Sequence, residues 1–307
     1  MIFSSQSMQE ILPLLQKELE NKERLTFSVL NPDLYDAYAG QSVEIEGETY
    51  IYRGYKAWLD LAELLKCKTL TPKIIDKHFV ELHFKKLSTD SFHADSKDLE
   101  KYGTHSHFAQ IHKMEEPAFL YYYLQALDNV KVEYRTRILN LGVNRGDEFE
   151  VIKNTLNTKK YQKLEFVGID HSNTAIATAK ELFSEDNVRF YAQDINDLDV
   201  LKLGRFDLLI SIGTLQSPSI DFKPFFMSLV QNYLQKDSAI ILGFPNSRWL
   251  GGEMLYGAKA PNYAMSEQSL LYNDVMFCKK YLQQKKYRVT LTGKQYLFLT
   301  ATKILSD

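Results

Sequence analysis

Residues 137–152 read RILNLGVNRGDEFEVI, and this stretch decides which fold the chain adopts. An apolar run at Ile138–Leu141 leads into a turn that contains Gly142 and Gly146, and helix-forming residues begin at about Asp147. Glycine permits turn dihedrals that other residues avoid, and it lets the backbone approach a ligand closely. The stretch therefore predicts a buried strand, a tight turn and a helix whose first N–H groups face a ligand.

The same alternation of short apolar runs and helix-like stretches continues to the C-terminus. Apolar runs of this length, separated by helices, are typical of buried parallel strands. The predicted strands are Ile138–Leu141, Phe166–Ile169, Val188–Ala192, Phe206–Ile212 and Ile240–Phe244, and the predicted helices are Asp147–Leu156, Thr174–Phe183, Phe225–Leu234 and Glu267–Gln284. Two strand-like runs then flank Gly293-Lys294, which predicts a closing antiparallel hairpin. We expect an α/β fold with a Rossmann-like sheet.

The N-terminal region has a different pattern, which predicts a smaller α+β region. SVEIEGETYIYRG predicts a hairpin that turns at Gly47, and AWLDLAELL predicts a short helix. Thr71-Pro72 has the residues of a helix start, with Thr71 as cap. We expect an N-terminal region at 1–110 and a ligand-binding domain at 111–307, in which a first helix begins at Pro117.

The glycine spacing argues against a dinucleotide. A nicotinamide or flavin site requires G-x-G-x-x-G, but Asn144 and Asp147 stand where the second and third glycines would be. A Gly-Lys-Ser/Thr phosphate loop is also absent. Asp147 and Glu148 would repel a pyrophosphate at the start of the helix.

The turn instead resembles motif I of class I S-adenosylmethionine-dependent methyltransferases, whose pattern is acidic-x-Gly-x-Gly-x-Gly. This chain has Asn140-x-Gly142-x-Asn144-x-Gly146. Asn144 is a mild departure, because Asn tolerates left-handed dihedrals better than most residues. Asn140 removes a charge that the family places near the methionine ammonium. The resemblance covers about residues 115–307.

Later residues follow the same family order. Asp170 ends the second strand, where the family holds the ribose hydroxyls with an acid, and Asp194 follows the third, where an acid contacts the adenine amino group. An isolated Asp after a strand is more often a helix cap, so the order of the motifs carries the argument. The strand Phe206–Ile212 resembles motif IV, which faces the transferring methyl. The resemblance implies S-adenosylmethionine as cofactor, held by Asn140, Gly142, Asn144, Gly146, Asp170, His171, Asp194, Ile195, Ser211 and Gly213.

The methyl acceptor is less defined by the sequence. We expect direct in-line displacement to a small molecule or an RNA, with the N-terminal region helping to recognise the acceptor. The stretch FPNSRWLGGEMLYGAKAPNYAMS predicts a long structureless loop, and such loops are often functional. Our hypothesis is that Asn246, Arg248 and Trp249 contact the substrate. A surface loop whose aromatics cover the core is an equal alternative.

Charge and histidine distribution leave further alternatives. Two lysine-rich stretches, at 66–86 and 279–303, could bind an RNA backbone, although the net charge of −2 favours ordinary solvated faces. His93, Asp95, His105 and His107 could hold a metal, but no recognised spacing supports this, and we predict no metal site.

The remaining features of the sequence are ordinary. Two cysteines without metal-type spacing, no secretory signal and no membrane-length apolar run favour a cytoplasmic enzyme with free thiols. Competing interpretations are a noncatalytic binding module on the same fold and, third, a nicotinamide-dependent reductase.

Overall fold

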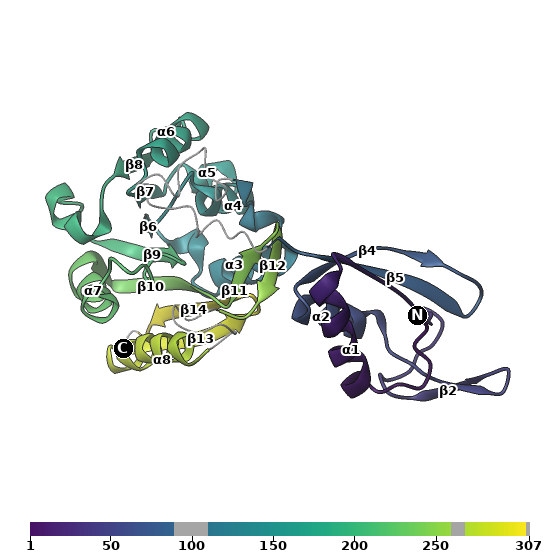
Figure 1. Ribbon diagram of the computed structural model, residues 1–307. Coiled ribbons are helices and arrows are strands. Elements are labelled where there is room, and N and C mark those ends of the chain that lie inside the picture. The colour runs from purple at the N-terminus through teal and green to yellow at the C-terminus, as the bar shows by residue number, and fades with distance from the viewer. Residues whose placement is uncertain (89–109, 259–267, 305–307) are drawn as a thin grey trace. The chain divides into compact units, whose positions relative to one another are not determined.

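The computed structural model of this 307-residue chain describes residues 1–88, 110–258 and 268–304. The chain divides into two compact units, and Figure 1 colours it from purple at the N-terminus to yellow at the C-terminus. Unit 1 contains Met1–Ser91 and Trp249–Leu255, and unit 2 contains Phe92–Arg248 and Tyr256–Asp307. Each unit has a hydrophobic core of its own.

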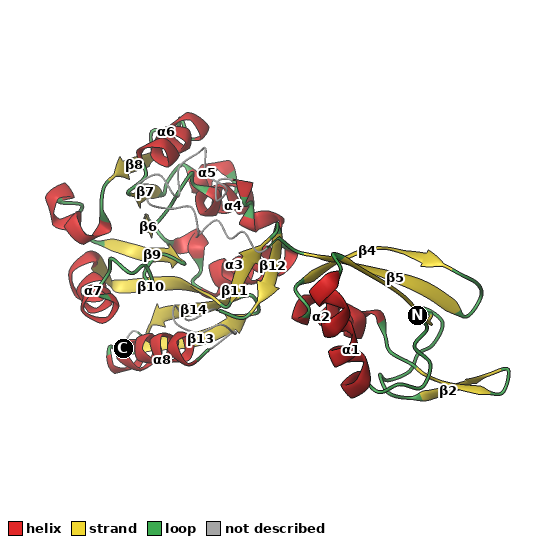
Figure 2. Ribbon diagram, viewed as in Figure 1, coloured by secondary structure: helices red, strands yellow, loops and turns green. Residues whose placement is uncertain are grey.

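Unit 1 is a small α+β unit. Its helices and strands are α1 (Met8–Asn21), β1 (Arg24–Leu30), β2 (Ser42–Ile45), β3 (Glu48–Ile51), α2 (Tyr55–Leu64), β4 (Cys67–Ile74) and β5 (Phe79–Lys86). Strands β1, β5 and β4 form an antiparallel sheet in that order. Figure 2 shows α1 and α2 beside this sheet. Leu15 of α1 and Trp58 of α2 share one core with Phe27 and Phe84 of the strands, so the helices cover one face.

Two of the elements predicted for the N-terminal region are present, and one prediction is wrong. Strands β2 and β3 form the hairpin, with Gly47 at a φ of 84° in its turn, and α2 covers most of the predicted helix. Thr71 and Pro72 do not begin a helix but lie inside β4. Strand β4 is at the edge of its sheet, and its pairing with β5 shifts register between Leu70 and Lys73. An edge with shifted register accommodates proline, which has no N–H to donate.

Unit 2 contains the predicted Rossmann-like sheet. Its elements are η2 (Lys113–Glu115), α3 (Pro117–Asn129), η3 (Val132–Tyr134), β6 (Arg137–Leu141), α4 (Asp147–Thr155), α5 (Thr158–Tyr161), β7 (Glu165–Asp170), α6 (Asn173–Leu182), β8 (Val188–Ala192), η4 (Ile195–Leu201), β9 (Phe206–Ile212), α7 (Phe222–Ser228), η5 (Leu229–Tyr233), β10 (Leu234–Pro245), α8 (Ser269–Gln284), β13 (Tyr287–Gly293) and β14 (Tyr296–Lys303). The strand order is β13-β14-β10-β9-β6-β7-β8. Strands β6 to β10 pair in parallel, and β14 is antiparallel to both β10 and β13. The five parallel strands and the closing hairpin confirm the predicted fold.

Helices cover both faces of this sheet. Leu139 and Leu141 of β6 share a core with residues of η4, α7 and α8. On the other face, the Phe149 ring of α4 lies edge-on to the Phe166 ring of β7, with centroids 5.0 Å apart. Because alternate residues of a strand point to opposite faces, Asn140 lies on the α4 side of the sheet.

The stretch after β10 is not the structureless loop that the sequence analysis predicted. It forms a hairpin of β11 (Ser247–Leu250) and β12 (Glu253–Tyr256). The turn residues Gly251 and Gly252 have φ values of 55° and 87°. A two-residue hairpin turn of type I′ requires positive φ at both positions, and Gly-Gly between apolar runs is a known signal for it. Residues 259–267 lie outside the described residues.

Candidate functional site

The strand order changes direction between β6 and β9, and an open α/β sheet has its ligand crevice at such a point. The chain runs from β6 through β7 to β8 on one side of β6, and then places β9 and β10 on the other side. Ligands of open α/β sheets bind at such a reversal, outside the carboxyl ends of the strands. The residues after β6 and β9 meet there, because a Cβ built on Gly142 would lie 1.8 Å from Thr214 Oγ1. The predicted turn and the predicted fourth strand therefore converge on one place.

The turn after β6 has an unusual backbone. Gly142, Asn144 and Gly146 all adopt positive φ, at 75°, 47° and 97°. Asn144 thus has the left-handed conformation that the sequence analysis expected of a residue in the place of a glycine. Gly146 is the N-cap of α4, so the turn leads directly into the helix.

Asp170 ties this turn to the neighbouring strand ends. Its side chain is buried, and its Oδ2 accepts a hydrogen bond from the Asn144 N–H at 2.9 Å. Its Oδ1 accepts from the Ser172 N–H at 3.0 Å, and its backbone carbonyl accepts from the Gln193 N–H at 2.9 Å. The neighbouring His171 is half exposed, with Nδ1 3.5 Å from Asp170 Oδ1. Asp170 therefore occupies the junction of the ends of β6, β7 and β8.

Asp194 and Ile195 lie beyond β8. Asp194 is exposed and caps η4, since its Oδ1 accepts from the N–H and the Nδ2 of Asn196 at 2.8 and 3.0 Å. A helix cap was the alternative to a cofactor contact that the sequence analysis left open for this residue. Ile195 is buried in the core of unit 2.

Ser211 and Gly213 lie at the carboxyl end of β9. Ser211 is buried, and its hydroxyl donates to the carbonyl of Leu141 at 3.2 Å, which joins β9 to β6. Gly213 has a φ of 72°, and a Cβ there would lie 3.5 Å from Pro245 and 3.8 Å from the Tyr296 ring. Gly213 therefore faces the carboxyl end of β10 and the start of β14.

A buried charged group beside this turn was not predicted as part of the site. Asn140 Nδ2 donates to Glu148 Oε2 at 3.4 Å, and only 8% of Glu148 is exposed. Burial raises the pKa of Glu148 to about 7, while the positive charge of Lys113 and the hydrogen bond from Asn140 oppose the rise. The sequence did contain a signal that Glu148 belongs to the site. Asn140 stands where an acid is usual, and Glu148 supplies an acid within the first turn of α4.

The three predicted substrate residues are divided between the units. Asn246 and Arg248 belong to unit 2 and Trp249 to unit 1. Asn246 is buried, and its Nδ2 donates to the Lys294 carbonyl at 3.2 Å. Within the described part of the chain, its Oδ1 is buried without a hydrogen-bond partner. Arg248 Nη1 donates to the Gly257 carbonyl at 3.2 Å. Their contact with a substrate stays a prediction.

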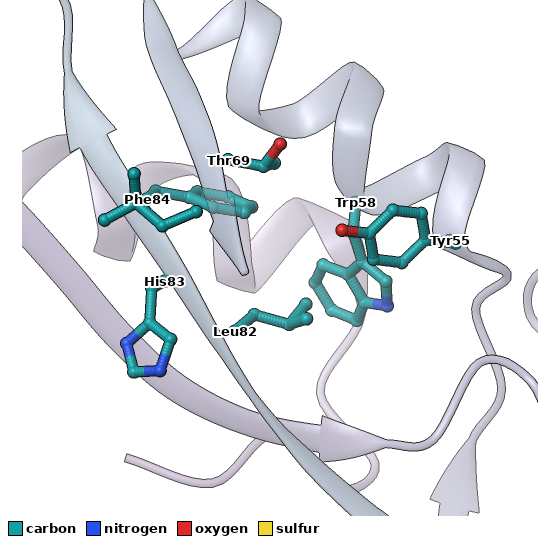
Figure 3. Close-up of a pocket in the computed structure, with 7 residues that line it drawn as sticks. Tyr55, Trp58, Thr69, Leu82, His83 and Phe84 are labelled. Atoms are coloured by element: carbon teal, nitrogen blue, oxygen red, sulfur yellow. The ribbon is translucent and has the colours of Figure 1, made fainter. Parts of the chain in front are cut away.

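A small pocket lies in unit 1 against α2, and Figure 3 draws the residues that line it as sticks. It is lined by Tyr55, Trp58, Thr69, Leu70, Leu82, His83 and Phe84. These residues come from α2, β4 and β5, and none belongs to the predicted site. Among the described residues, Trp58 Nε1 is a buried donor without a hydrogen-bond partner.

The other predictions concern metal, thiols and membrane. Over 1–88, 110–258 and 268–304, no group of three His, Cys, Asp or Glu side chains is arranged to hold a metal ion. His93, Asp95, His105 and His107 lie outside those residues. Both cysteines are free and buried. None of the described helices is long and apolar enough to span a membrane.

Comparison with protein families identifies the domain. Residues 135–294, just over half of the chain, match the family described as methyltransferase domain. The chain belongs to this family. The match confirms the class I S-adenosylmethionine-dependent methyltransferase predicted from the sequence, with S-adenosylmethionine as methyl donor. Among curated proteins, no sequence match is found.

Several solved structures are similar to this methyltransferase. The plantazolicin methyltransferase BpumL in complex with SAH is 12% identical, with a TM-score of 0.47 over 70% of this chain and 93% of that chain. The magnesium protoporphyrin IX methyltransferase ChlM from Synechocystis PCC 6803 with bound SAM is 15% identical, with a TM-score of 0.40 over 64% and 86%. TehB from Haemophilus influenzae is 13% identical, with a TM-score of 0.41 over 74% and 70%.

Proposed function

We propose that this methyltransferase binds S-adenosylmethionine in the crevice between β6 and β9 and transfers the methyl group directly to an acceptor by in-line displacement. One observation carries the proposal. The buried Asp170 carboxylate lies at the end of β7 and accepts the N–H of Asn144 in the turn after β6. An acid so placed at a switch point is suited to a ribose, because a carboxylate has acceptor sites for both hydroxyls of a diol.

The other side chains of the site fit the remaining parts of the cofactor. Asp194 is exposed at the end of β8 and has acceptor capacity for the adenine amino group, with Ile195 beside the ring and His171 beside the ribose. The turn formed by Asn140, Gly142, Asn144 and Gly146 leads from Asp170 toward the end of β9. Ser211 and Gly213 would then face the reacting methyl.

The bound sulfonium supplies a methyl carbon that is already activated. The protein's task is to hold the nucleophile in line, at about 3–3.5 Å from that carbon, and to exclude water. A base is required only if the acceptor must lose a proton. We assign no residue to that role.

The acceptor is a small molecule or an RNA in our proposal, with Asn246, Arg248 and Trp249 as contacts. The buried and unsatisfied Oδ1 of Asn246 supports this, because a buried acceptor without a donor costs about 1–3 kcal/mol unless a ligand satisfies it. We also propose that unit 1 contributes to acceptor recognition.

One feature of unit 1 supports the RNA alternative. Lys85 of β5 lies directly opposite Arg24 of β1 on one side and Lys68 of β4 on the other. Three like charges in register across a sheet destabilise it, and an anionic partner would relieve the repulsion. These three side chains point to the same face of the sheet as Thr26 and His83. That face is opposite the one that α1 and α2 cover.

The RNA alternative is tested by fluorescence anisotropy with a single-stranded RNA oligonucleotide. Lys85→Glu should weaken binding. It should also reduce the slope of the logarithm of the binding constant against the logarithm of the salt concentration by about one unit or more. Lys17→Glu, on the exposed side of α1, is the matched control. Equal binding by both variants and the wild type would leave a small molecule as the acceptor.

The cofactor proposal is tested by isothermal titration of the purified protein with S-adenosylmethionine, S-adenosylhomocysteine and NADH. We expect both adenosyl ligands to bind, NADH not to bind, and Asp170→Ala to weaken the adenosyl ligands. Failure of the wild-type protein to bind either adenosyl ligand would refute the proposed function.

A further inference from the structure

Glu148 is a buried acid, and acidic side chains are rarely buried. It is in the first turn of α4, yet it is as buried as a core residue, and it contacts Asn140 near the end of β6. A helix N-terminus stabilises an acid, but only by about 0.3–1 kcal/mol at ordinary sites. That is small beside the several kcal/mol that burying a carboxylate costs.

Lys113 supplies the opposite charge. It lies in η2, far from Glu148 in sequence, and its charge favours the ionised form of Glu148. Burial opposes protonation of Lys113, but Tyr296 and Glu148 outweigh it, and the pKa of Lys113 is raised. The Lys113 Nζ lies 5.3 Å from the centre of the Tyr296 ring, and that ring approaches Gly213 at the end of β9. Glu148 therefore lies by the end of β6, and Lys113 lies beside Tyr296, whose ring approaches the end of β9.

Packing alone gives little reason for such a pair. A buried ion pair is often no more stabilising than apolar residues of the same volume, because both ions lose their hydration. Two opposite charges held at the site of a ligand do have a use if the ligand carries two opposite charges itself. The amino-acid end of S-adenosylmethionine carries an ammonium and a carboxylate on the same carbon.

We propose that Glu148 and Lys113 recognise the amino-acid end of the cofactor. The Glu148 carboxylate and the side-chain oxygen Oδ1 of Asn140 accept hydrogen bonds from the ammonium, and Lys113 donates to the carboxylate. This inference rests on the proposed function. Glu148 thereby supplies from α4 the negative charge that Asn140 lacks on β6. The Asn140–Glu148 hydrogen bond holds the carboxylate at the end of the strand.

The test compares S-adenosylhomocysteine with 5′-methylthioadenosine, which has the same nucleoside and thioether but no amino-acid end. Isothermal titration should show that Glu148→Gln weakens S-adenosylhomocysteine by about 10- to 100-fold, the equivalent of losing a hydrogen bond to a charged group. Lys113→Gln should have a similar effect. Both variants should bind 5′-methylthioadenosine within about twofold of wild type, which also shows that the site is folded.

Two exposed residues give matched controls. Glu150→Gln changes the same charge on the same helix, and Lys159→Gln removes an exposed lysine from α5. Neither should alter either affinity.

The pH dependence provides a second readout. The titratable groups that interact with Glu148 are Lys113 from η2, Tyr123 from α3 and Asp147 on its own helix, and Tyr296 lies beside Lys113. Wild-type affinity for S-adenosylhomocysteine should fall as the pH falls below 7 and Glu148 is protonated, whereas affinity for 5′-methylthioadenosine should not. Glu148→Gln should remove this dependence.

The outcomes separate this inference from the proposed function. If the wild type binds none of the adenosyl ligands, the proposed function itself fails. If Glu148→Gln binds S-adenosylhomocysteine as tightly as wild type, or loses both ligands equally, the proposed function survives and the recognition role of Glu148 is refuted.

Discussion

The backbone N–H of Asn144 donates to Asp170 Oδ2 at 2.9 Å, and this bond links the turn after β6 to the end of β7. Asn144 has a φ of 47°, so its N–H is directed by a left-handed turn rather than by a helix or strand. The carboxylate thus supports the turn and offers its remaining acceptor sites to a ligand.

Asp170→Asn should reduce the affinity for S-adenosylmethionine by about 10- to 100-fold, because the amide has one acceptor oxygen where the carboxylate has two. Isothermal titration measures the loss. Glu181→Gln, an exposed acid on α6, should bind as wild type. Unchanged affinity in Asp170→Asn would show that Asp170 does not bind the cofactor.

Gly142→Ala should destabilise the protein by about 2–4 kcal/mol. The added Cβ would lie 1.8 Å from Thr214 Oγ1, and alanine is strained at a φ of 75°. The melting temperature of unit 2 should fall by roughly 5–15 °C.

The same substitution in a Thr214→Gly background separates the two causes. The contact is then removed, and Gly142→Ala should cost about 1–2 kcal/mol less than in the wild type, leaving the cost of the backbone conformation. Strictly additive effects would show that Gly142 and Thr214 do not interact.

Glu148 should make stability depend on pH in the direction opposite to an ordinary acid. Its folded pKa of about 7 exceeds the unfolded value of 4.5, so the folded state holds a proton that the unfolded state releases. The contribution is fully present below pH 4.5 and is lost as the pH rises through 7. Relative to Glu148→Gln, the wild type should therefore lose about 3 kcal/mol between pH 4.5 and pH 7.5.

Urea unfolding at a series of pH values measures this difference. Lys113 does not titrate in that interval, because its pKa is raised from 10.5. A constant difference between Glu148→Gln and wild type would mean that Glu148 is ionised in the folded protein at pH 5.

The fold could be predicted where burial is uniform along a strand. Strand β9 was predicted as Phe206–Ile212, and every residue of it is buried. Elements at the edge of a sheet or in unit 1 were harder to predict from the sequence. Pro72 is a helix-start residue in the sequence, but tertiary pairing places it at a register shift in β4. Helix α1 was missed although Ser7 and Glu10 form a capping box before it.

The site could be predicted only where a motif lies within one strand and the turn after it. Asp170 is the last residue of β7, so its place at the carboxyl edge follows from the strand. The Lys113–Glu148 pair joins two elements on opposite sides of β6 in the sequence. No local pattern encodes that electrostatic interaction, which depends on where the fold places η2 and α4.

Arg248→Ala should abolish or strongly reduce methyl transfer while leaving cofactor affinity unchanged, if the hairpin after β10 contacts the acceptor. Turnover is measured by transfer of a radiolabelled methyl group to fractionated metabolites and to RNA. Arg189→Ala, a half-exposed residue of β8 near Glu165, controls for the loss of a surface arginine. Unchanged turnover in Arg248→Ala would refute its contact with the substrate.

Asp207→Ala should be among the most destabilising changes in unit 2 that lie away from the proposed site. Its Oδ2 accepts from the N–H and the Oγ1 of Thr136, both at 2.7 Å, and its Oδ1 accepts from the Arg137 N–H at 2.9 Å. Asp207 is buried, so alanine would leave these donors at the start of β6 without an acceptor, at a cost of about 3 kcal/mol. The urea midpoint should fall accordingly, whereas the exposed Asp186→Ala should change stability by no more than about 0.5 kcal/mol. Equal midpoints for the two variants would show that β6 is held at its start by strand pairing alone.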